Sequence, residues 1–168
     1  MVHPLLIKKF ESESQMMKDY LQNKTSSDYI EFETEEPVNF YRICVTHLRY
    51  NIYIKSDDPS DLEAMIGDFC LGILVDHYFI YVDTKTFQNQ ISDLYVYGLG
   101  LVYKPSLSCF YCILQTGFFC YNTKNKNTRY KDVGELILDW KWGNKEQTIV
   151  KYTFDSLKFY DFNLLSIN

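Results

Sequence analysis

The sequence predicts an α+β fold, a single domain of residues 1–168 with helices in the N-terminal half and an antiparallel sheet of about six strands. Helical spacing of apolar residues occurs only before Gly72. From residue 73 onward the apolar residues recur mostly with a period of two, and the short, turn-rich connections leave no room for a crossover helix. A composition of 46% hydrophobic and 17% aromatic residues supports one compact core.

The first 55 residues are expected to contain one helix and two or three strands. Phe10, Met17 and Leu21 fall near one stripe, which predicts a helix over residues 8–23. Alternating residues after position 25 predict a strand that is interrupted at Pro37. The segment 38–55 is rich in β-branched and aromatic residues and is expected to form one long strand or two shorter ones.

A second helix is expected at DDPSDLEAMIGD, residues 57–68, which holds five carboxylates. Asp58 followed by Pro59 fits a helix N-cap and first helical position. Acidic side chains in the first turn would be favoured by the helix dipole. Gly72 is a plausible stop. The apolar residues at helical spacing are Leu62, Met65, Ile66 and Phe69.

The remaining residues are expected to form the sheet as an antiparallel meander, and no internal repeat is recognised. Gly98 and Gly100 lie inside an apolar strand, where they predict a bulge or a close packing contact. No helix longer than about ten residues is expected between residues 93 and 142. The strand candidates are residues 73–83, 93–105, 107–123, 135–144, 147–156 and 158–167.

No set of residues with the spacing of a catalytic or metal site is found. Asp76 and His77 could be an acid and the base that it orients, but neighbouring residues of a strand point to opposite faces. Cys109 and Cys112 have C-x-x-C spacing without a second ligand pair, so they are expected to be structural. The sequence therefore predicts a protein that is not an enzyme and has no cofactor and no metal.

Cysteine usage and hydropathy lead to the expectation of a cytoplasmic protein without a membrane partner. The chain has an odd number of cysteines, five, and they lie in apolar stretches, which is typical of buried thiols in a reducing compartment. It has no run of 18 apolar residues, and its opening apolar stretch is too short for a signal peptide.

Charge is distributed unevenly along the chain. The net charge is −5, but residues 1–83 carry −8 and residues 84–168 carry +3. Nucleic-acid binding needs a basic field, and although the loop that contains Lys124, Lys126, Arg129 and Lys131 could touch phosphate, a solvated loop explains it equally well. No nucleic-acid partner is expected.

In its size, acidity, low glycine content and lack of active-site motifs, the chain resembles bacterial immunity proteins, such as those of contact-dependent growth inhibition systems. The resemblance is one of overall profile and transfers no individual residue. It implies a non-enzymatic protein that neutralises a basic partner, most simply a cognate nuclease toxin, with charge complementarity raising the association rate.

The carboxylates expected to meet that partner lie in the front half of the sequence. With such a protein partner, no small-molecule ligand is expected. One alternative hypothesis is a small-molecule-binding or hydrolytic α+β domain, and another is a viral or bacterial host-interaction protein. A pocket that contains a carboxylate or histidine would favour the small-molecule alternative. The predicted partner-binding residues are Glu31, Glu33, Glu35, Glu36, Asp57, Asp58, Asp61, Glu63 and Asp68.

Overall fold

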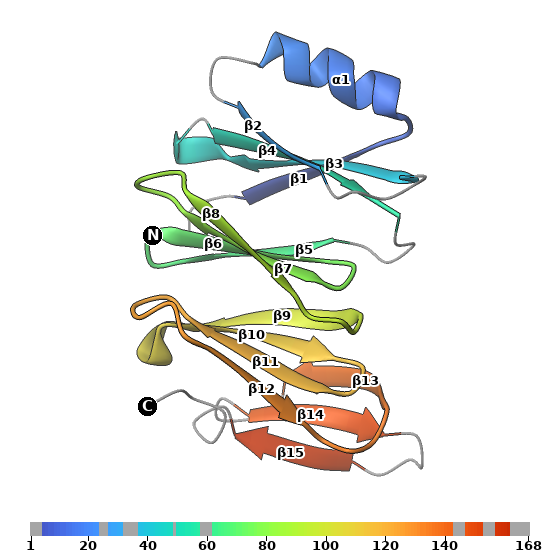
Figure 1. The fold of residues 1–168 in the computed structure, drawn as a ribbon, viewed down its shortest axis with the longest axis vertical. Coiled ribbons are helices and arrows are strands. Elements are labelled where there is room, and N and C mark those ends of the chain that lie inside the picture. The colour runs from blue at the N-terminus through green and yellow to red at the C-terminus, as the bar shows by residue number, and fades with distance from the viewer. Residues whose placement is uncertain are drawn as a thin grey trace. The chain divides into compact units, whose positions relative to one another are not determined.

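The chain forms two compact units, residues 1–62 and residues 63–168, in a computed structural model (Figure 1). The structure describes residues 5–23, 27–31, 37–48, 50–57, 62–142, 147–152 and 157–161. These residues contain fifteen strands in four sheets, but only one α-helix. The predicted α+β class with about six strands is therefore wrong, because the protein is mostly β. The single domain expected for residues 1–168 stays a prediction.

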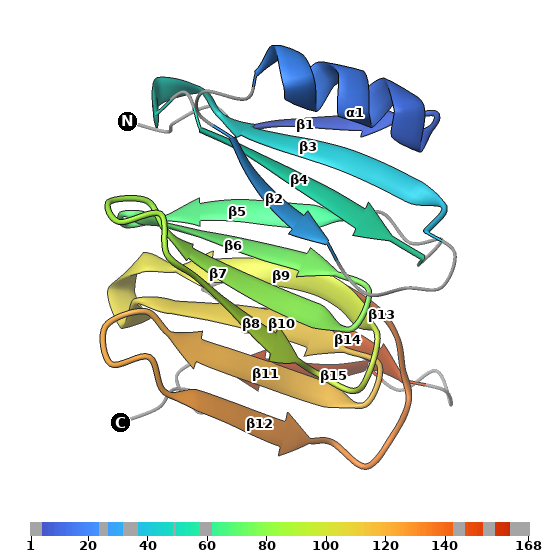
Figure 2. The ribbon, with the colours of Figure 1, turned by 45° about the horizontal axis from the view of Figure 1, so that its top comes forward.

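The first unit is a four-stranded sheet with the helix α1 (Glu13–Gln22) on one face, as Figure 2 shows. The predicted helix over residues 8–23 begins too early, because Lys8 to Phe10 pair with the neighbouring strand and Ser12 is the N-cap. The strands follow the order β1-β3-β4-β2, and only β2 is parallel to its neighbour. Their bounds are β1 Leu5–Phe10, β2 Ser27–Glu31, β3 Asn39–Val45 and β4 Tyr50–Ser56.

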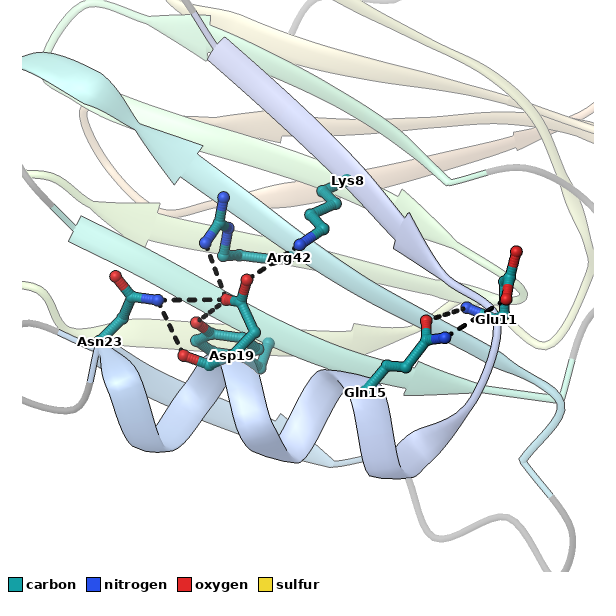
Figure 3. Close-up of polar contacts among 7 residues, drawn as sticks. Lys8, Glu11, Gln15, Asp19, Asn23 and Arg42 are labelled. Carbon is teal, nitrogen blue, oxygen red and sulfur yellow. Dashed lines mark hydrogen bonds and ion pairs between the residues drawn. The ribbon is translucent and has the colours of Figure 1, made fainter.

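Asp19 connects α1 to this sheet (Figure 3). Its carboxylate accepts hydrogen bonds from Arg42 and from the Tyr53 hydroxyl, both at 2.7 Å, and from Lys8 at 3.0 Å. Burial acts against ionisation, but the hydrogen bonds from Tyr53 and Lys8 and the positive charge of Arg42 outweigh it and lower the pKa of Asp19. This network is a structural attachment, since the hydrogen bonds of Asp19 join the helix to β1, β3 and β4.

The second unit consists of three sheets, and all of its strand pairings are antiparallel. Strands that are adjacent in sequence are adjacent in space, so each sheet is a meander. The first sheet contains β5 Glu63–Gly67, β6 Cys70–Val75, β7 Tyr78–Asp83 and β8 Asn89–Asp93. The second contains β9 Gly98–Lys104, β10 Cys109–Leu114, β11 Gly117–Asn122 and β12 Thr128–Asp132. The third contains β13 Ile137–Trp142, β14 Gln147–Tyr152 and β15 Leu157–Asp161.

The second predicted helix is the hairpin β5–β6. Asp68 and Phe69 form its two-residue turn, and Phe69 has a left-handed backbone with φ 58°, which ends any helix. The helical spacing of its apolar residues is coincidental, because Met65 and Ile66 are neighbours in strand β5 and Phe69 lies in the turn with 66% of its surface exposed. The expectation of no long helix between residues 93 and 142 is confirmed.

A repeat of 39 residues relates the first and second sheets of this unit, although none was recognised in the sequence. Strand β6 begins at Cys70 and β10 at Cys109, and β7, β8 and β9 are followed at the same interval by β11, β12 and β13. Few residues are identical between the two copies. The identical pairs are Cys70 and Cys109, Phe79 and Phe118, Thr84 and Thr123, Lys85 and Lys124, Asp93 and Asp132, and Leu99 and Leu138.

The turns of the two copies repeat their hydrogen bonds as well. The Asp83 carboxylate accepts from the N–H of Lys85 at 2.8 Å, and the Asn122 side chain accepts from the N–H of Lys124 at 2.9 Å. Phe87, four residues after Asp83, is left-handed with φ 58°. Lys126, its equivalent, has φ 61°. The repeat is therefore a property of backbone and turns, which Asp and Asn can cap equally well.

The three sheets pack face to face, which is the arrangement of blades in a β-propeller. Strand β9 contacts β5 and β6 of the preceding sheet and β13 of the following one. Phe79 packs against Phe110, Phe119 and Tyr121 in the core between the first two sheets. Phe118, its repeat equivalent, packs in the core on the other face of the second sheet. The first and second sheets thus use an equivalent phenylalanine to pack against the sheet that follows.

The glycines of β9 provide the predicted bulge and the predicted close contacts. The register between β9 and β10 shifts where Leu114 pairs with Gly98 and Ile113 pairs with Gly100. A methyl group on Gly100 would overlap the indole ring of Trp140, whose Nε1 donates to the Leu99 carbonyl at 2.7 Å. The prediction for this pair of glycines is confirmed.

Candidate pocket on the first sheet of the second unit

An open pocket of about 310 Å³ lies at the end of the β5–β8 sheet. Two connections form it: the turn between β6 and β7, which carries His77, and the segment that joins β8 to β9 and carries Tyr95 and Tyr97. They meet because Asp93, the last residue of β8, pairs with Tyr78, the first residue of β7. The lining residues are His77, Asp93, Tyr95 and Tyr97.

Asp76 and His77 do pair, against the expectation from the sequence. Asp76 has a left-handed backbone with φ 56° and forms the hairpin turn with His77, so strand alternation does not apply to them. The Nδ1 of His77 lies 2.9 Å from the carboxylate of buried Asp76. A carboxylate at Nδ1 fixes the orientation of the imidazole ring. His77 Nε2 lies 3.9 Å from Asp93 Oδ1, so the ring spans the two carboxylates.

Backbone hydrogen bonds hold the segment 93–98 against the hairpin turn. The N–H of Leu94 donates to the His77 carbonyl at 2.8 Å, and the N–H of Gly98 donates to the Asp76 carbonyl at 3.1 Å. Asp93 Oδ1 accepts from the Tyr95 N–H at 2.8 Å. The pocket wall is therefore fixed by its backbone, independently of the Tyr95 side chain.

The second sheet carries the same turns without the same side chains. Its equivalent hydrogen bonds run from the Val133 N–H to the Thr116 carbonyl at 3.1 Å and from the Ile137 N–H to the Gln115 carbonyl at 2.7 Å. Asp132 accepts from the Gly134 N–H at 2.7 Å, as Asp93 does from Tyr95. The carboxylate that caps the turn is kept in both copies. The pairs that differ are His77 and Thr116, Tyr95 and Gly134, and Tyr97 and Leu136.

The side chain of Tyr95 is not explained by packing. It is 86% exposed, so packing does not require an aromatic ring there. Its backbone is left-handed with φ 60°, a conformation that raises the free energy of a residue with a side chain by about 1–2 kcal/mol. In the second sheet the equivalent residue is Gly134, with φ 71°. An exposed tyrosine at a position that suits glycine indicates a role outside folding.

The chemistry of the pocket is that of recognition. Two tyrosine rings, a half-exposed carboxylate and an oriented imidazole provide flat apolar surface and hydrogen-bonding groups. None of the lining side chains within the described residues is a serine, threonine, cysteine or lysine nucleophile. In the described part of the chain, no group of three or more His, Cys, Asp or Glu side chains is placed to hold a metal ion.

The predicted partner-binding carboxylates are only partly described. Asp57 is exposed, and Asp68 lies in the exposed β5–β6 turn with its carboxylate 3.4 Å from the Tyr103 hydroxyl. Glu63 does not face outward, because it is partly buried and accepts from the Leu101 N–H at 2.6 Å. Burial raises the pKa of Glu63, against the effect of that hydrogen bond.

Glu31 lies in β2, and nothing is described of its side chain. Those outside the described residues are Glu33, Glu35, Glu36, Asp58 and Asp61. Binding of a basic protein partner by these carboxylates stays a prediction.

The C-x-x-C pair is divided between two cores, as strand geometry predicts. Cys109 belongs to the core on one face of the second sheet, and Cys112 belongs to the core on the other face. Burial raises the pKa of the Cys112 thiol well above its usual value. All five cysteines are free thiols.

Comparison with known proteins identifies a similar fold and no family. No known family and no curated protein matches the chain. The crystal structure of the extracellular domain of BT4673 from B. thetaiotaomicron, provisionally assigned to a one-component system, is similar with a TM-score of 0.50 and 11% identity. The match covers 76% of this chain and 18% of the other. A second crystal structure of the same BT4673 domain, provisionally assigned to a hybrid two-component system, has a TM-score of 0.49, 11% identity and coverages of 75% and 18%.

These comparisons correct the expected location. The chain spans less than a fifth of the solved chain that has a TM-score of 0.50, and that chain is described as an extracellular domain. The cytoplasmic location expected from the sequence is wrong as an inference, because buried free thiols follow from packing and do not fix a compartment. No helix among the described residues has the length and apolar character needed to cross a membrane.

Proposed function

We propose that the protein is a non-enzymatic binding protein that recognises a small molecule at the pocket formed by His77, Asp93, Tyr95 and Tyr97. The observation that carries this proposal is Tyr95, an exposed ring on a left-handed backbone where the equivalent turn has Gly134. A fold that accepts glycine at this position has no need of a strained tyrosine. Contact with a bound ligand explains why this position has a tyrosine.

The pocket meets the structural needs of such a site. Its volume of about 310 Å³ is at the lower end of the range for small-molecule pockets, and it joins aromatic surface to a few polar groups. Because the repeated backbone hydrogen bonds fix both connections, little ordering is needed when a ligand binds. The similar solved structures, described as extracellular domains of signalling systems, accord with binding in place of catalysis.

The test exchanges the pocket residues for those of the second sheet. In the triple variant His77→Thr, Tyr95→Gly, Tyr97→Leu, each new side chain is the one found at the equivalent position 39 residues later. The variant should therefore fold. A library of small metabolites is screened by ligand-observed NMR against the full-length wild type and this variant. We expect compounds that bind the wild type and lose binding in the variant.

Leu136→Ala is the control, since it changes the equivalent loop of the second sheet, where the residue is 44% exposed. It should leave binding unchanged. Equal binding of every compound to the wild type and the triple variant would contradict the proposal.

A further inference from the structure

We infer that the ligand of this pocket is a small organic ammonium ion, an inference that rests on the proposed binding function. The first reason is charge. Asp93 is exposed at the pocket and Asp76 lies directly behind His77, while no lysine or arginine is among the described lining residues. The exposed carboxylate of Asp93 would attract a positively charged ligand to the pocket.

The second reason is the arrangement of the rings. His77 and Tyr97 are nearly perpendicular, with an interplanar angle of 83° and ring centroids 6.1 Å apart. Tyr95 adds a second exposed tyrosine to the pocket. Two walls at a right angle enclose a compact, roughly spherical group better than a flat one. Tyrosine rings attract a cation within about 6 Å of the ring centroid, and quaternary ammonium groups are bound in this way.

The third reason is the state of Asp93. Its Oδ1 accepts from the Tyr95 N–H, which fixes the carboxylate at the pocket without supplying a countercharge. Asp132 makes the same bond to Gly134 in a turn that lacks both tyrosines. The carboxylate is thus part of the turn in both sheets. Only the turn of the first sheet also has tyrosine rings beside this carboxylate.

The experiment uses a ligand pair that differs in charge and hardly in shape. Choline and 3,3-dimethyl-1-butanol, in which carbon replaces the quaternary nitrogen, are titrated into the ¹⁵N-labelled full-length protein. We expect saturable shifts of the amide signals of residues 76–77 and 93–97 with choline, and binding of the neutral compound weaker by about ten-fold. Glucose serves as a neutral polyhydroxylated probe and should not bind.

Asp93→Asn and Asp132→Asn form a matched pair of variants. Each keeps an oxygen that can cap its turn and removes one charge. Choline binding should weaken about ten-fold in Asp93→Asn and stay unchanged in Asp132→Asn. Melting curves of both variants establish that they fold, and a Tyr95→Gly variant should lose choline binding independently of either carboxylate.

The outcomes separate the two proposals. Binding of glucose or of the neutral isostere at the same residues, at least as tightly as choline, would overturn the ammonium inference and leave the binding function standing. Equal loss of choline binding in both asparagine variants would also overturn it, since the effect would then not come from the pocket. If the metabolite screen also finds no ligand sensitive to the triple substitution, the binding function itself is contradicted.

Discussion

Replacing Tyr95 with glycine should leave the stability of the protein unchanged or raise it. The left-handed backbone at φ 60° raises the free energy of the folded state by about 1–2 kcal/mol for a residue with a side chain, and glycine removes this strain. Glycine also makes the unfolded chain more flexible, which lowers stability by about 0.5–1 kcal/mol. Because the side chain is 86% exposed, little packing is lost. The net change is a gain of about 0–1.5 kcal/mol.

The assay is urea denaturation of the full-length protein, followed by circular dichroism. Tyr97→Gly is the matched control: Tyr97 lies two residues along the same segment, is not among the residues with positive φ, and packs its ring edge-on to His77. Tyr97→Gly should lose about 1 kcal/mol or more, since glycine there gives flexibility without relieving strain. A loss above about 1 kcal/mol in Tyr95→Gly would show that the ring supports the fold, and the reasoning for a ligand would fail.

Three further changes test the rest of the structure. Gly134→Ala should lower the free energy of unfolding by about 1 kcal/mol in the same urea assay, because the space is open but φ is 71°. Gly100→Ala should lower it by about 2–3 kcal/mol and change tryptophan fluorescence, since the new methyl group displaces the Trp140 indole. Asp19→Asn should lower it by about 2–3 kcal/mol, because Arg42 loses its carboxylate partner. Folding lowers the pKa of Asp19, so the ionised carboxylate stabilises the folded state fully above its unfolded value of 3.8, and this stabilisation is lost as the pH falls through the lowered value. The free energy of unfolding of Asp19→Asn should therefore fall less steeply with acid than that of the wild type.

The β-rich second half could be predicted from period-two patterns, but the number of strands could not. Runs such as residues 107–123 read as one strand because both strands of a hairpin are apolar and their two-residue turn, Gln115 and Thr116, contains neither glycine nor proline. The β5–β6 hairpin could not be predicted for a similar reason. Its turn residue Phe69 has a left-handed backbone, a conformation that glycine and asparagine adopt much more readily than phenylalanine.

The candidate site cannot be recognised in any single segment of the sequence, because it becomes evident only when the two copies of the 39-residue repeat are aligned. Strand alternation argues against a pair of Asp76 and His77, and no motif in the sequence marks Asp93, Tyr95 or Tyr97. Aligning residues 70–103 with residues 109–142 shows the shared turn-capping Asp93 and Asp132 and the contrast between Tyr95 and Gly134. That this contrast falls on a left-handed residue follows only from the structure.

The most direct test of the account is a map of ligand contacts on the full-length protein. Amide shifts of the ¹⁵N-labelled wild type are recorded with mixtures of small metabolites, and the two equivalent sets of turns serve as an internal comparison. Shifts should be confined to residues 76–77 and 93–97, with none at residues 115–116 and 132–136, which share the backbone hydrogen bonds but lack the aromatic rings. Equal shifts at both sets, or shifts only elsewhere in the chain, would contradict it.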